Sequence, residues 1–564
     1  MQLSEQELVR RDKLAKLRAL GINPYPADLY PLNHTSKQIK ENFENGKKVT
    51  IAGRLMSRRI QGNASFAELQ DSEGRIQVYF NRDEICSGDD KSKYNEVYKK
   101  LLDIGDFIGV EGELFTTKVG QKSVRVIDFT LLSKALRPLP LPKTDSEGNT
   151  FDEFNDPELR YRQRYADLVV NPHVKDVFIK RSKLFTAMRN FFSDASYFEV
   201  ETPILQPIPG GAAARPFITH HNSLDVPMYM RIACELYLKK VLIGGFDGVY
   251  EFAKTFRNEG MDKTHNPEFT MMEIYVAYKD YNWMMDFCEQ LLEHCAIAVN
   301  GTSKVTFGEH NVDFKAPYAR ITMTDSIKHF TGFDITGKTE VEIRDAAKNM
   351  NIEVDDTMGK GKLIDEIFGE KCEKNYIQPT YITDYPKEMS PLCKEHRDNP
   401  ELTERFELIV CGKELANAYS ELNDPIDQRE RFEHQLKLAK KGDDEATEFI
   451  DHDFLRALEY GMPPTSGMGI GMDRLIMFLT NNQSIQEVLF FPQMRPEKKA
   501  IAMTDEEKAV MAILKANTPI DLVSLKTQSG LSNKKWDKTI KGLAKHGLAK
   551  VTKTEDALVV EVQE

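Results

Sequence analysis

Residues 250–260 read YEFAKTFRNEG, a run that joins an apolar stretch to a charged loop. Its apolar part predicts a strand that ends at Phe256, and Arg257 then opens a polar loop that contains Gly260. An arginine at the end of a strand is well suited to hold a phosphate through two parallel hydrogen bonds. A lone arginine is more often part of a surface salt bridge, so the run needs companions before it predicts a phosphate site.

A second run, GMGIGMDR at residues 467–474, lies ahead of a predicted helix. Glycine at every second position lets a ligand approach the backbone closely, because no side chain stands in the way. Arg474, at the start of the helix, could meet a second phosphate. Glycines also serve the tight packing of a helix on a strand, so this run is weak when taken alone.

An acidic run, ELANAYSELND at residues 414–424, precedes the glycine run. Asn417, Tyr419 and Glu421 alternate, so in a strand they share one face. Glu414 and Glu421 are two carboxylates that could hold Mg²⁺ beside bound phosphates, because Mg²⁺ is a hard cation that prefers oxygen ligands. An isolated acidic pair is more often a solvated edge, and that alternative stays open on these residues alone.

The part of the chain before these runs has a different pattern. Between Lys47 and Leu132 apolar residues alternate in short stretches that are separated by turns with glycine. Five such stretches predict a small closed barrel of the OB-fold type, with a helical insert between Asn81 and Asp103. The proline-rich run RPLPLP at residues 137–142 suits neither a helix nor a central strand, so it predicts a stiff spacer.

These patterns together predict a multidomain α+β protein. The large domain mixes strands and helices with long connections, which is typical of an antiparallel sheet, and the tail predicts three helices and a hairpin. The predicted segments are an N-terminal helical segment at 1–45, an OB-fold β-barrel at 46–136, a linker at 137–170, a large antiparallel-sheet domain at 171–500 and a small winged-helix-like module at 503–564.

Composition sets limits on the class of protein. With 564 residues the chain is too long for one core. The formal net charge of −12 argues mildly against a nucleic-acid binder but leaves room for a local basic stripe. The seven cysteines form no CxxC pair, so neither a disulfide framework nor a structural zinc site is predicted. The sequence has neither a signal-peptide core nor a long apolar run, so we expect a cytoplasmic protein without a membrane span.

Taken together, these runs resemble the motifs of one family. The segment FEVETP at 198–203, the FRNE run and the glycine run ending at Arg474 resemble motifs 1, 2 and 3 of class II aminoacyl-tRNA synthetases. The barrel ahead of them is similar to that of subclass IIb. The longer strings that resemble the bacterial lysyl-tRNA synthetases are IPGGAAARPFITHHN at 208–222, RNEGMDKTHNPEFTMMEIYVAY at 257–278 and ELANAYSELNDP at 414–425.

The resemblance covers residues 1–496 and implies a two-step reaction. ATP and the amino acid form an aminoacyl-adenylate and pyrophosphate, and the acyl group then passes to the 3′-terminal ribose of tRNA. It implies that Arg257 holds the α-phosphate and Arg474 the γ-phosphate. The further implied ATP contacts are Glu259, His265, Phe269 and Glu414, with Glu414 and Glu421 as ligands of Mg²⁺. In-line attack at phosphorus needs positioning and charge neutralisation, so no covalent nucleophile is expected.

Lysine is the amino acid that the resemblance implies. Its ammonium group needs carboxylate partners in a pocket, because an unpaired buried charge is costly. We expect Glu273 with Tyr275 to face the ε-ammonium group and Glu235 to face the α-amino end. The full set of implied lysine-binding residues is Gly211, Glu235, Glu273, Tyr275, Asn417, Tyr419 and Glu421.

The barrel is implied to bind the anticodon of tRNA(Lys). Single-stranded bases are recognised by stacking on aromatic rings and by hydrogen bonds to their edges. Phe66 resembles the stacking residue of the family, and Arg59 and Gln77 resemble its polar readers. Without the family, a residue of the barrel core explains Phe66 equally well. A homodimer is also implied, with motif 1 at its interface.

Two parts of the sequence depart from the family pattern. Cys234 stands where the pattern RIAPEL has proline, which predicts some loss of local rigidity, with a reactive thiol as the less favoured reading. The tail lies outside the resemblance, and its third helix gathers lysines around Trp536. Those lysines, which form a basic face for tRNA phosphates or a solvated surface, are Lys534, Lys535, Lys538, Lys541 and Lys545.

Three other functions compete with this interpretation. A ligase that attaches lysine to a protein would lack the anticodon barrel. A non-catalytic nucleic-acid-binding protein on an inactive synthetase core would not need Arg257, Glu414, Glu421 and Arg474. A subclass IIb enzyme for aspartate or asparagine would want a cation in the substrate pocket, which the acidic pocket disfavours.

Overall fold

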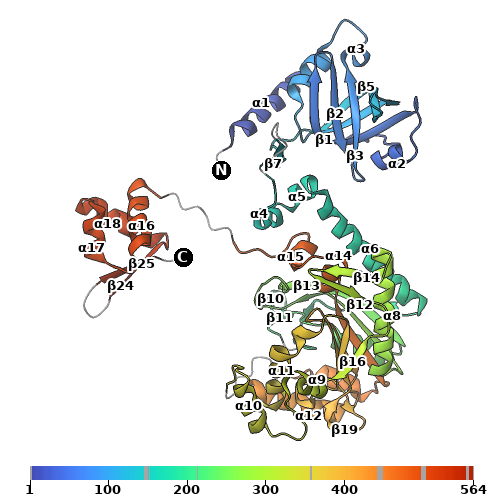
Figure 1. Cartoon of the computed structure of the whole chain (residues 1–564), viewed down its shortest axis with the longest axis vertical. Coiled ribbons are helices and arrows are strands. Elements are labelled where there is room, and N and C mark those ends of the chain that lie inside the picture. The colour runs from blue at the N-terminus through green and yellow to red at the C-terminus, as the bar shows by residue number, and fades with distance from the viewer. Residues whose placement is uncertain are drawn as a thin grey trace. The chain divides into compact units, whose positions relative to one another are not determined.

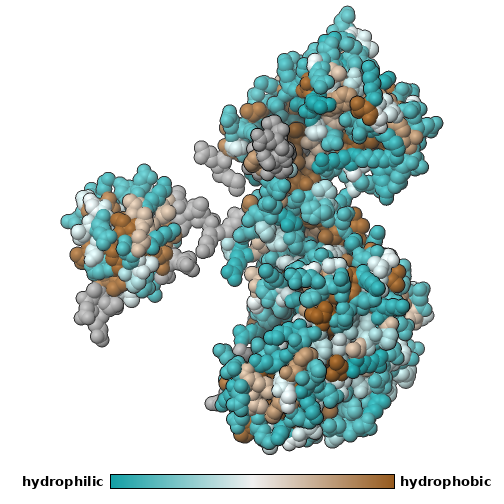
Figure 2. All heavy atoms as spheres, viewed as in Figure 1, coloured by the Kyte–Doolittle hydropathy of each residue, from teal (hydrophilic) through white to brown (hydrophobic). Residues whose placement is uncertain are grey.

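The computed structural model describes residues 3–144, 150–151, 153–212, 214–355, 358–440, 449–496, 503–553 and 558–562. The chain divides into two compact units, Met1–Gln493 and Met494–Glu564 (Figure 1). Hydrophilic side chains cover most of the visible surface, with apolar groups in small clusters (Figure 2). Among the helices in these ranges, none is both long and apolar enough to span a membrane.

The first unit begins with two helices and the barrel. Helix α1 (Glu5–Ala19) starts with a capping box at Ser4 and ends before Gly21, whose φ of +74° suits a glycine. Helix α2 (Ser36–Glu41) precedes the first strand. The barrel strands are β1 (Lys48–Gln61), β2 (Ala64–Gln70), β3 (Arg75–Asn81), β4 (Phe107–Thr116) and β5 (Lys122–Ser133).

These strands close into a barrel in the order β1-β2-β3-β5-β4, as the alternating pattern predicted. In β2 and β3 every second side chain is buried, which is what a barrel with one packed face requires. The predicted helical insert is present as α3 (Arg82–Ile85) and a π-helix, η1 (Lys93–Leu101). The OB-fold prediction is therefore confirmed.

Two helices occupy the last part of the predicted linker. The proline-rich run at 137–142 forms no helix or strand. It is followed by β6 (Lys143–Thr144), β7 (Thr150–Phe151), α4 (Pro157–Arg162) and α5 (Arg164–Val170). The buried side chain of Arg164 forms an ion pair with Asp167 at 2.6 Å, and Arg160 pairs with Glu487 at 3.0 Å. The second pair anchors α4 to the large domain, and Arg164 anchors α5 by donating to the backbone carbonyl of Gln486 at 2.7 Å.

The large domain is built on an eight-stranded sheet. Its strands follow the order β16-β17-β20-β21-β22-β13-β12-β8. All neighbours are antiparallel except the two outermost pairs, β16 with β17 and β12 with β8. The strands are β8 (Phe198–Glu199), β12 (Gly248–Phe256), β13 (Glu268–Ala277), β16 (Ala319–Thr322), β17 (Thr380–Thr383), β20 (Arg405–Val410), β21 (Lys413–Ser420) and β22 (Thr465–Gly471).

One face of the sheet packs on α6 (Pro172–Asp194), α8 (Tyr281–Asn300) and α14 (Met472–Thr480), and this is the main hydrophobic core (Figure 1). Helix α7 (Glu235–Ile243) packs through Leu238 and Leu242 against Tyr275, whose side chain belongs to the opposite face. The sheet therefore has one fully covered face and one face on which a ligand site can form.

The remaining elements surround this second face and the sheet edges. Small sheets and short strands are β9 (Leu205–Gln206), β10 (Ile218–His221), β11 (Val226–Met230), β14 (Lys304–Phe307), β15 (His310–Asp313), β18 (Glu395–His396) and β19 (Asn399–Thr403). The helices are α9 (Met323–Thr331), α10 (Glu340–Asn349), α11 (Lys360–Lys371), η2 (Glu373–Asn375), η3 (Lys387–Met389), α12 (Pro425–Ala439), α13 (His452–Glu459) and α15 (Ile485–Val488).

The second unit has the three helices and the hairpin that the sequence predicted. They are α16 (Asp505–Asn517), α17 (Leu522–Ser529), α18 (Asn533–Lys545), β24 (Ala549–Lys553) and β25 (Leu558–Val562), with a short strand β23 (Ile520–Asp521) that joins the hairpin. Trp536, Leu543 and Val560 are buried in its own small core. This unit therefore has the order of helices and strands of a winged-helix module.

Candidate active site

A cavity of about 880 Å³ lies on the open face of the large sheet. A volume of this size suits a nucleotide together with a small second substrate. Nine of the residues predicted for substrates or metal line it: Gly211, Glu235, Arg257, Glu259, Glu273, Tyr275, Glu414, Asn417 and Tyr419. His265, Phe269, Glu421 and Arg474 are not part of its wall.

Strand alternation explains why β13 contributes to the cavity. Glu273 and Tyr275 line the cavity, whereas Met272, Ile274 and Val276 lie in the main core under the sheet. Successive side chains of a strand point to opposite faces, so the apolar residues anchor the strand and leave the polar ones facing the ligand.

The predicted glycine run forms strand β22, between the two strands that carry the polar residues. Gly469 lies opposite Glu273 on β13 and opposite Asn417 on β21. A Cβ atom at Gly469 would lie 3.0 Å from the Cε atom of Met271, and one at Gly467 would overlap the Tyr275 ring. Glycine suits these two positions because the side chains of Met271 and Tyr275 occupy the space that a Cβ atom would need.

A β-bulge in β21 determines where Glu414 points. Ile409 pairs with Glu414 but Leu408 pairs with Ala416, so Leu415 is an extra residue in this strand. Leu415 and Ala416 are both in the core, and Glu414 therefore lines the cavity together with Asn417. Without the bulge, strict alternation would turn Glu414 to the core side of the sheet.

The acidic end of the cavity contains an internal cation. Lys239 of α7 is 0% exposed, and its Nζ atom lies 2.5 Å from Oε1 of Glu235 and forms an ion pair with Glu421. Burial disfavours the charged form of Lys239, but Glu235 and Glu421 outweigh this effect and raise the pKa of the lysine. The hydroxyl of Tyr419 donates to Oε2 of Glu235 at 2.8 Å.

Glu273 is the third carboxylate of this end, and it has no cationic partner within the described ranges of the chain. It accepts hydrogen bonds from the backbone N–H of Cys234 at 3.3 Å and from the hydroxyl of Tyr275 at 3.1 Å. Burial, and next the charge of Glu235, raise the pKa of Glu273. A cationic ligand group would remove this electrostatic cost.

Glu421 lies beneath the cavity rather than on its wall. It is 1% exposed, follows the last residue of β21, and its carboxylate lies against Gly467. Its Oε2 atom forms the ion pair with Lys239, and its buried Oε1 atom has no hydrogen-bond partner among the described residues. The structure thus places Glu421 at the acidic end with Glu235, and not in a two-carboxylate cluster with Glu414.

Glu407 is the carboxylate that the structure places near Glu414, and the sequence analysis did not single it out. It lies on β20 opposite Asn417, lines the cavity and accepts a hydrogen bond from Arg405 at 2.6 Å. Burial, and next the charge of Glu414, raise the pKa of Glu407. A regular hairpin at Cys411 and Gly412 would have placed Glu407 opposite Ala416, and the bulge at Leu415 shifts it opposite Asn417.

The basic end is formed by the loop after β12. Arg257 lines the cavity, its guanidinium group lies 5.3 Å from the centre of the Phe269 ring, and its buried Nε atom has no hydrogen-bond acceptor among the described residues. Arg474 at the start of α14 donates to the backbone carbonyl of Glu414. His265 is exposed and contacts Asp262 at 2.9 Å. Of the three basic residues predicted for ATP, Arg257 is therefore the one that lines the cavity, whose wall also includes Arg405, Lys360 and Lys362.

Cys234 is not a reactive thiol. It is fully buried at the start of α7, and burial, followed by the charge of Glu273, raises the pKa of the thiol well above its usual range. A thiolate is the reactive form of cysteine, and it is disfavoured here. The contribution of this residue to the site comes from its backbone N–H group.

The barrel presents the predicted reader residues on its outer face. Phe66 on β2 lies opposite Arg59 on β1 and opposite Tyr79 on β3. Its ring is half-buried and lies 5.0 Å from the Tyr79 ring, whose other neighbour is Phe115 at 5.8 Å. Phe66 is therefore not part of the barrel core. Gln77 lies on the same face, two residues from Tyr79 on β3, and accepts a hydrogen bond from Ser123 at 2.8 Å.

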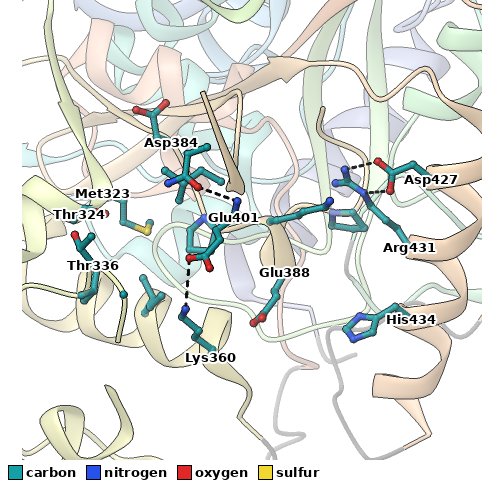
Figure 3. A pocket seen from close by; sticks show the side chains of 18 of the residues that line it. Met323, Thr324, Thr336, Lys360, Asp384, Glu388, Glu401, Asp427, Arg431 and His434 are labelled. Atoms are coloured by element: carbon teal, nitrogen blue, oxygen red, sulfur yellow. Dashed lines mark hydrogen bonds and ion pairs between the residues drawn. The ribbon is translucent and has the colours of Figure 1, made fainter. Parts of the chain in front are cut away.

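A second cavity of about 460 Å³ lies beside the first and is lined by α9, α11, α12 and the loop around 384–402 (Figure 3). Two ion pairs form within its lining: Arg431 pairs with Asp427 at 2.9 Å, and Lys360 lies 4.0 Å from Glu401. The lining has three Lys and Arg side chains against five Asp and Glu side chains, so acidic groups are in excess.

Comparisons with known proteins agree with this geometry. The family described as tRNA synthetases class II (D, K and N) matches residues 156–495, and the OB-fold nucleic acid binding domain matches residues 49–132. The chain therefore belongs to the class II tRNA synthetases.

Three similar proteins identify the branch of this family to which the chain belongs. A lysine–tRNA ligase of Christiangramia forsetii is 76% identical over 100% of this chain and 98% of its own length. One of Porphyromonas gingivalis is 66% identical over 92% of this chain and 90% of its own length. One of Azobacteroides pseudotrichonymphae is 62% identical over 88% and 99%, respectively. Within class II, the chain belongs to the lysine–tRNA ligases.

Proposed function

We propose that this chain joins L-lysine to tRNA(Lys) in two steps, with lysine held at the acidic end of the cavity and ATP at the basic end. The observation that carries this proposal is the balance of buried charges. Glu235, Glu273 and Glu421 are three carboxylates, and in the described part of the chain Lys239 is the one ammonium group paired with them. Two negative charges remain, which equals the number of ammonium groups on lysine.

The two ammonium groups of lysine bind at different carboxylates. Glu273, which lacks a cation, and Tyr275 receive the ε-ammonium group, and Glu235 receives the α-ammonium group. Lys239 is a positioning residue, because it holds Glu235 and Glu421 in place without touching substrate. Gly211, whose φ is +86°, lines the cavity close to the side chain of Glu235 and brings its backbone near the amino acid.

The first step takes place between the two ends. The α-carboxylate of lysine attacks the α-phosphorus of ATP, a P–O bond forms, and pyrophosphate leaves with the electrons of the broken P–O bond. Arg257 neutralises the charge that develops on the α-phosphate, because it lines the cavity and its buried Nε–H donor has no acceptor among the described residues. Phe269 carries the adenine ring beside it, and Arg474 meets the terminal phosphate.

The residues present fit a magnesium ion. Glu407 and Glu414 line the same cavity, and burial, followed by the charge of Glu414, raises the pKa of Glu407 although Arg405 opposes this. When bound, Mg²⁺ would neutralise phosphate charge and orient the leaving pyrophosphate. Glu414 and Glu407 would hold it. Glu421 remains a prediction as a ligand, and its ion pair with Lys239 favours a role in the acidic end instead.

In the second step the 3′-terminal ribose hydroxyl of tRNA attacks the carbonyl carbon of the adenylate, and AMP leaves. The barrel holds the anticodon: a base stacks on Phe66 beside Tyr79, and Arg59 and Gln77 read base edges. Stacking on a half-exposed ring suits single-stranded RNA, because an unpaired base has a free face.

We also infer that two copies of the chain associate through the motif 1 region. Apolar side chains are exposed in this segment, including Phe198 on the edge strand β8, whose ring lies 5.4 Å from that of the exposed Phe246. An exposed apolar surface of this kind is typical of a protein interface. The seven free cysteines fit a reducing compartment, and we propose a cytoplasmic location.

Exchange of labelled pyrophosphate into ATP tests the first step without tRNA. Each standard amino acid is supplied in turn, and we expect exchange with lysine alone. Exchange with aspartate or asparagine would reassign the pocket within the subclass, and no exchange would favour an inactive core. Charging of tRNA(Lys) by the same preparation, with no lysine transferred to protein, then separates tRNA ligation from protein lysylation.

A further inference from the structure

Helix α18 of the second unit carries a stripe of four lysines. Lys534, Lys538, Lys541 and Lys545 are spaced by four, three and four residues, so they lie on one face of the helix. All four are exposed, and the buried residues of α18, Trp536, Thr539 and Leu543, lie on the opposite face. The stripe spans about 16 Å at 1.5 Å per residue.

The charges of this stripe are not used inside the unit. The neighbouring Lys535 pairs with Glu506 at 2.9 Å, whereas the four stripe lysines form no ion pair within residues 503–553 and 558–562. Residues 494–564 contain 13 Lys and Arg against 10 Asp and Glu, a net charge of +3. The chain as a whole carries −12, so residues 1–493 carry −15. Positive charge is concentrated in the second unit.

The topology of the unit points to the same helix. Helices α17 and α18 are joined by three residues, 530–532, with Gly530 at a φ of +62°, and the hairpin β24–β25 follows. In a helix-turn-helix module the second helix is the one that meets nucleic acid. Here that second helix is α18, and its free face is the lysine stripe.

We propose that the lysine stripe of α18 binds the sugar-phosphate backbone of tRNA while the enzyme acts on it. Lysine is a point charge without the fork of arginine, so it suits phosphates rather than base edges. The choice of tRNA rests on the proposed function of the chain. Because the unit is part of the same chain, each weak phosphate contact acts at a high effective concentration once the barrel has bound the anticodon.

The unit is an addition to the catalytic machinery. The synthetase family match ends at residue 495, at the very start of the unit and ahead of its first helix, α16. The Azobacteroides relative aligns 499 residues as 99% of its length, so it is about 60 residues shorter than the 564 residues here. We therefore expect the stripe to change affinity for tRNA and to leave the adenylation chemistry unchanged.

The test replaces the four stripe lysines with glutamine in the full-length chain. The matched control replaces four other lysines of the same unit, which are Lys508, Lys515, Lys526 and Lys550. Dissociation constants for a tRNA(Lys) transcript are measured between 50 and 300 mM KCl, as roughly the range over which phosphate contacts are screened. Each lost contact lowers the slope of log K against log salt by about 0.7–0.9.

We expect the stripe variant to lose a slope of about 3, because four contacts of about 0.7–0.9 each are removed, the control to lose less than about 1, and a lysine-to-arginine stripe to keep the parent slope. Equal slopes in stripe and control variants would overturn the proposal. If the stripe lysines also supported binding of a DNA duplex with the same affinity as tRNA, the assignment of RNA as the partner would be overturned. Lysine-dependent pyrophosphate exchange should be the same in all variants, and its absence from the parent chain would refute the proposed function instead.

Discussion

The catalytic cavity and the outer face of the barrel recognise their ligands in different ways. In the cavity Lys239 and the carboxylates around it are buried, and each depends on one or two named partners. On the barrel Arg59 is exposed and Phe66 is half-buried, so water can replace either contact. Removing the partner of a buried charge costs about 3–5 kcal/mol, whereas the loss of an exposed contact costs about 1 kcal/mol.

The two regions should therefore respond differently to single substitutions. A single substitution in the cavity should remove substrate activation, because its buried charges are balanced only when each partner and the substrate are present. The barrel should lose affinity in steps, because stacking on Phe66 and Tyr79 contributes separately from the polar readers.

The largest effect is expected for Lys239→Met. This change leaves Glu235 and Glu421 buried without their cation, at a cost of about 3–5 kcal/mol in the free energy of unfolding. Urea unfolding measures this cost. The double variant Lys239→Met with Glu421→Gln removes one of the two orphaned charges and should recover part of the loss. No recovery would mean that the packing of Lys239, and not its charge, is what matters.

Glu273→Gln should abolish lysine activation with little damage to the fold. Removing the charge that faces the ε-ammonium group should lower kcat/KM for lysine in pyrophosphate exchange at least about 100-fold, as for a broken buried pair. The KM for ATP should stay within a few-fold of the parent. An unchanged rate with lysine would contradict the assignment of Glu273.

The same variant has a signature in stability. Burial raises the pKa of Glu273, so the folded state binds this proton more readily than the unfolded chain. The charged form therefore costs stability, and this cost grows as pH rises from the usual glutamate range through the raised pKa. Glutamine does not titrate, so Glu273→Gln should melt at the parent temperature or above it at pH 8, with the difference shrinking toward pH 4.

On the barrel, Phe66→Ala should act on tRNA alone. Loss of one stacking platform costs about 1–3 kcal/mol per base, so kcat/KM for tRNA(Lys) should fall roughly 10-fold. Tyr79→Ala is the matched variant, and it should have a smaller effect because Phe66 remains. Pyrophosphate exchange should not change. Equal damage to exchange and charging would show that Phe66 supports the fold and not the anticodon.

Strand patterns in the sequence were enough to predict the barrel, because alternation fixes which side chains enter its core. They were not enough for the acidic residues of the cavity. Alternation put Glu421 with Asn417 and Tyr419, but β21 ends at Ser420 and the chain then meets Lys239 of α7. A contact between elements so far apart in sequence leaves no trace in a local pattern.

The bulge in β21 is a second structural feature that a local sequence pattern could not predict, and it changes which carboxylates lie together. An extra residue at Leu415 cannot be read from alternation, and it is what turns Glu414 toward the cavity. Glu407 escaped notice because it is a single acid in the apolar strand RFELIV, which predicts a buried strand and nothing more. Register across the hairpin, rather than either strand alone, brings the two carboxylates to one place.

The smallest effect is expected at Cys234, where the family pattern has proline. The backbone N–H of Cys234 donates to Glu273 at 3.3 Å, and proline has no such donor. Cys234→Pro should therefore raise the KM for lysine several-fold, since a long hydrogen bond to a buried carboxylate contributes about 1 kcal/mol. Cys234→Ala keeps the N–H group and should bind lysine as the parent does. The same KM in both variants would show that the N–H group of residue 234 does not affect lysine binding. The hydroxyl of Tyr275 alone would then orient the carboxylate of Glu273.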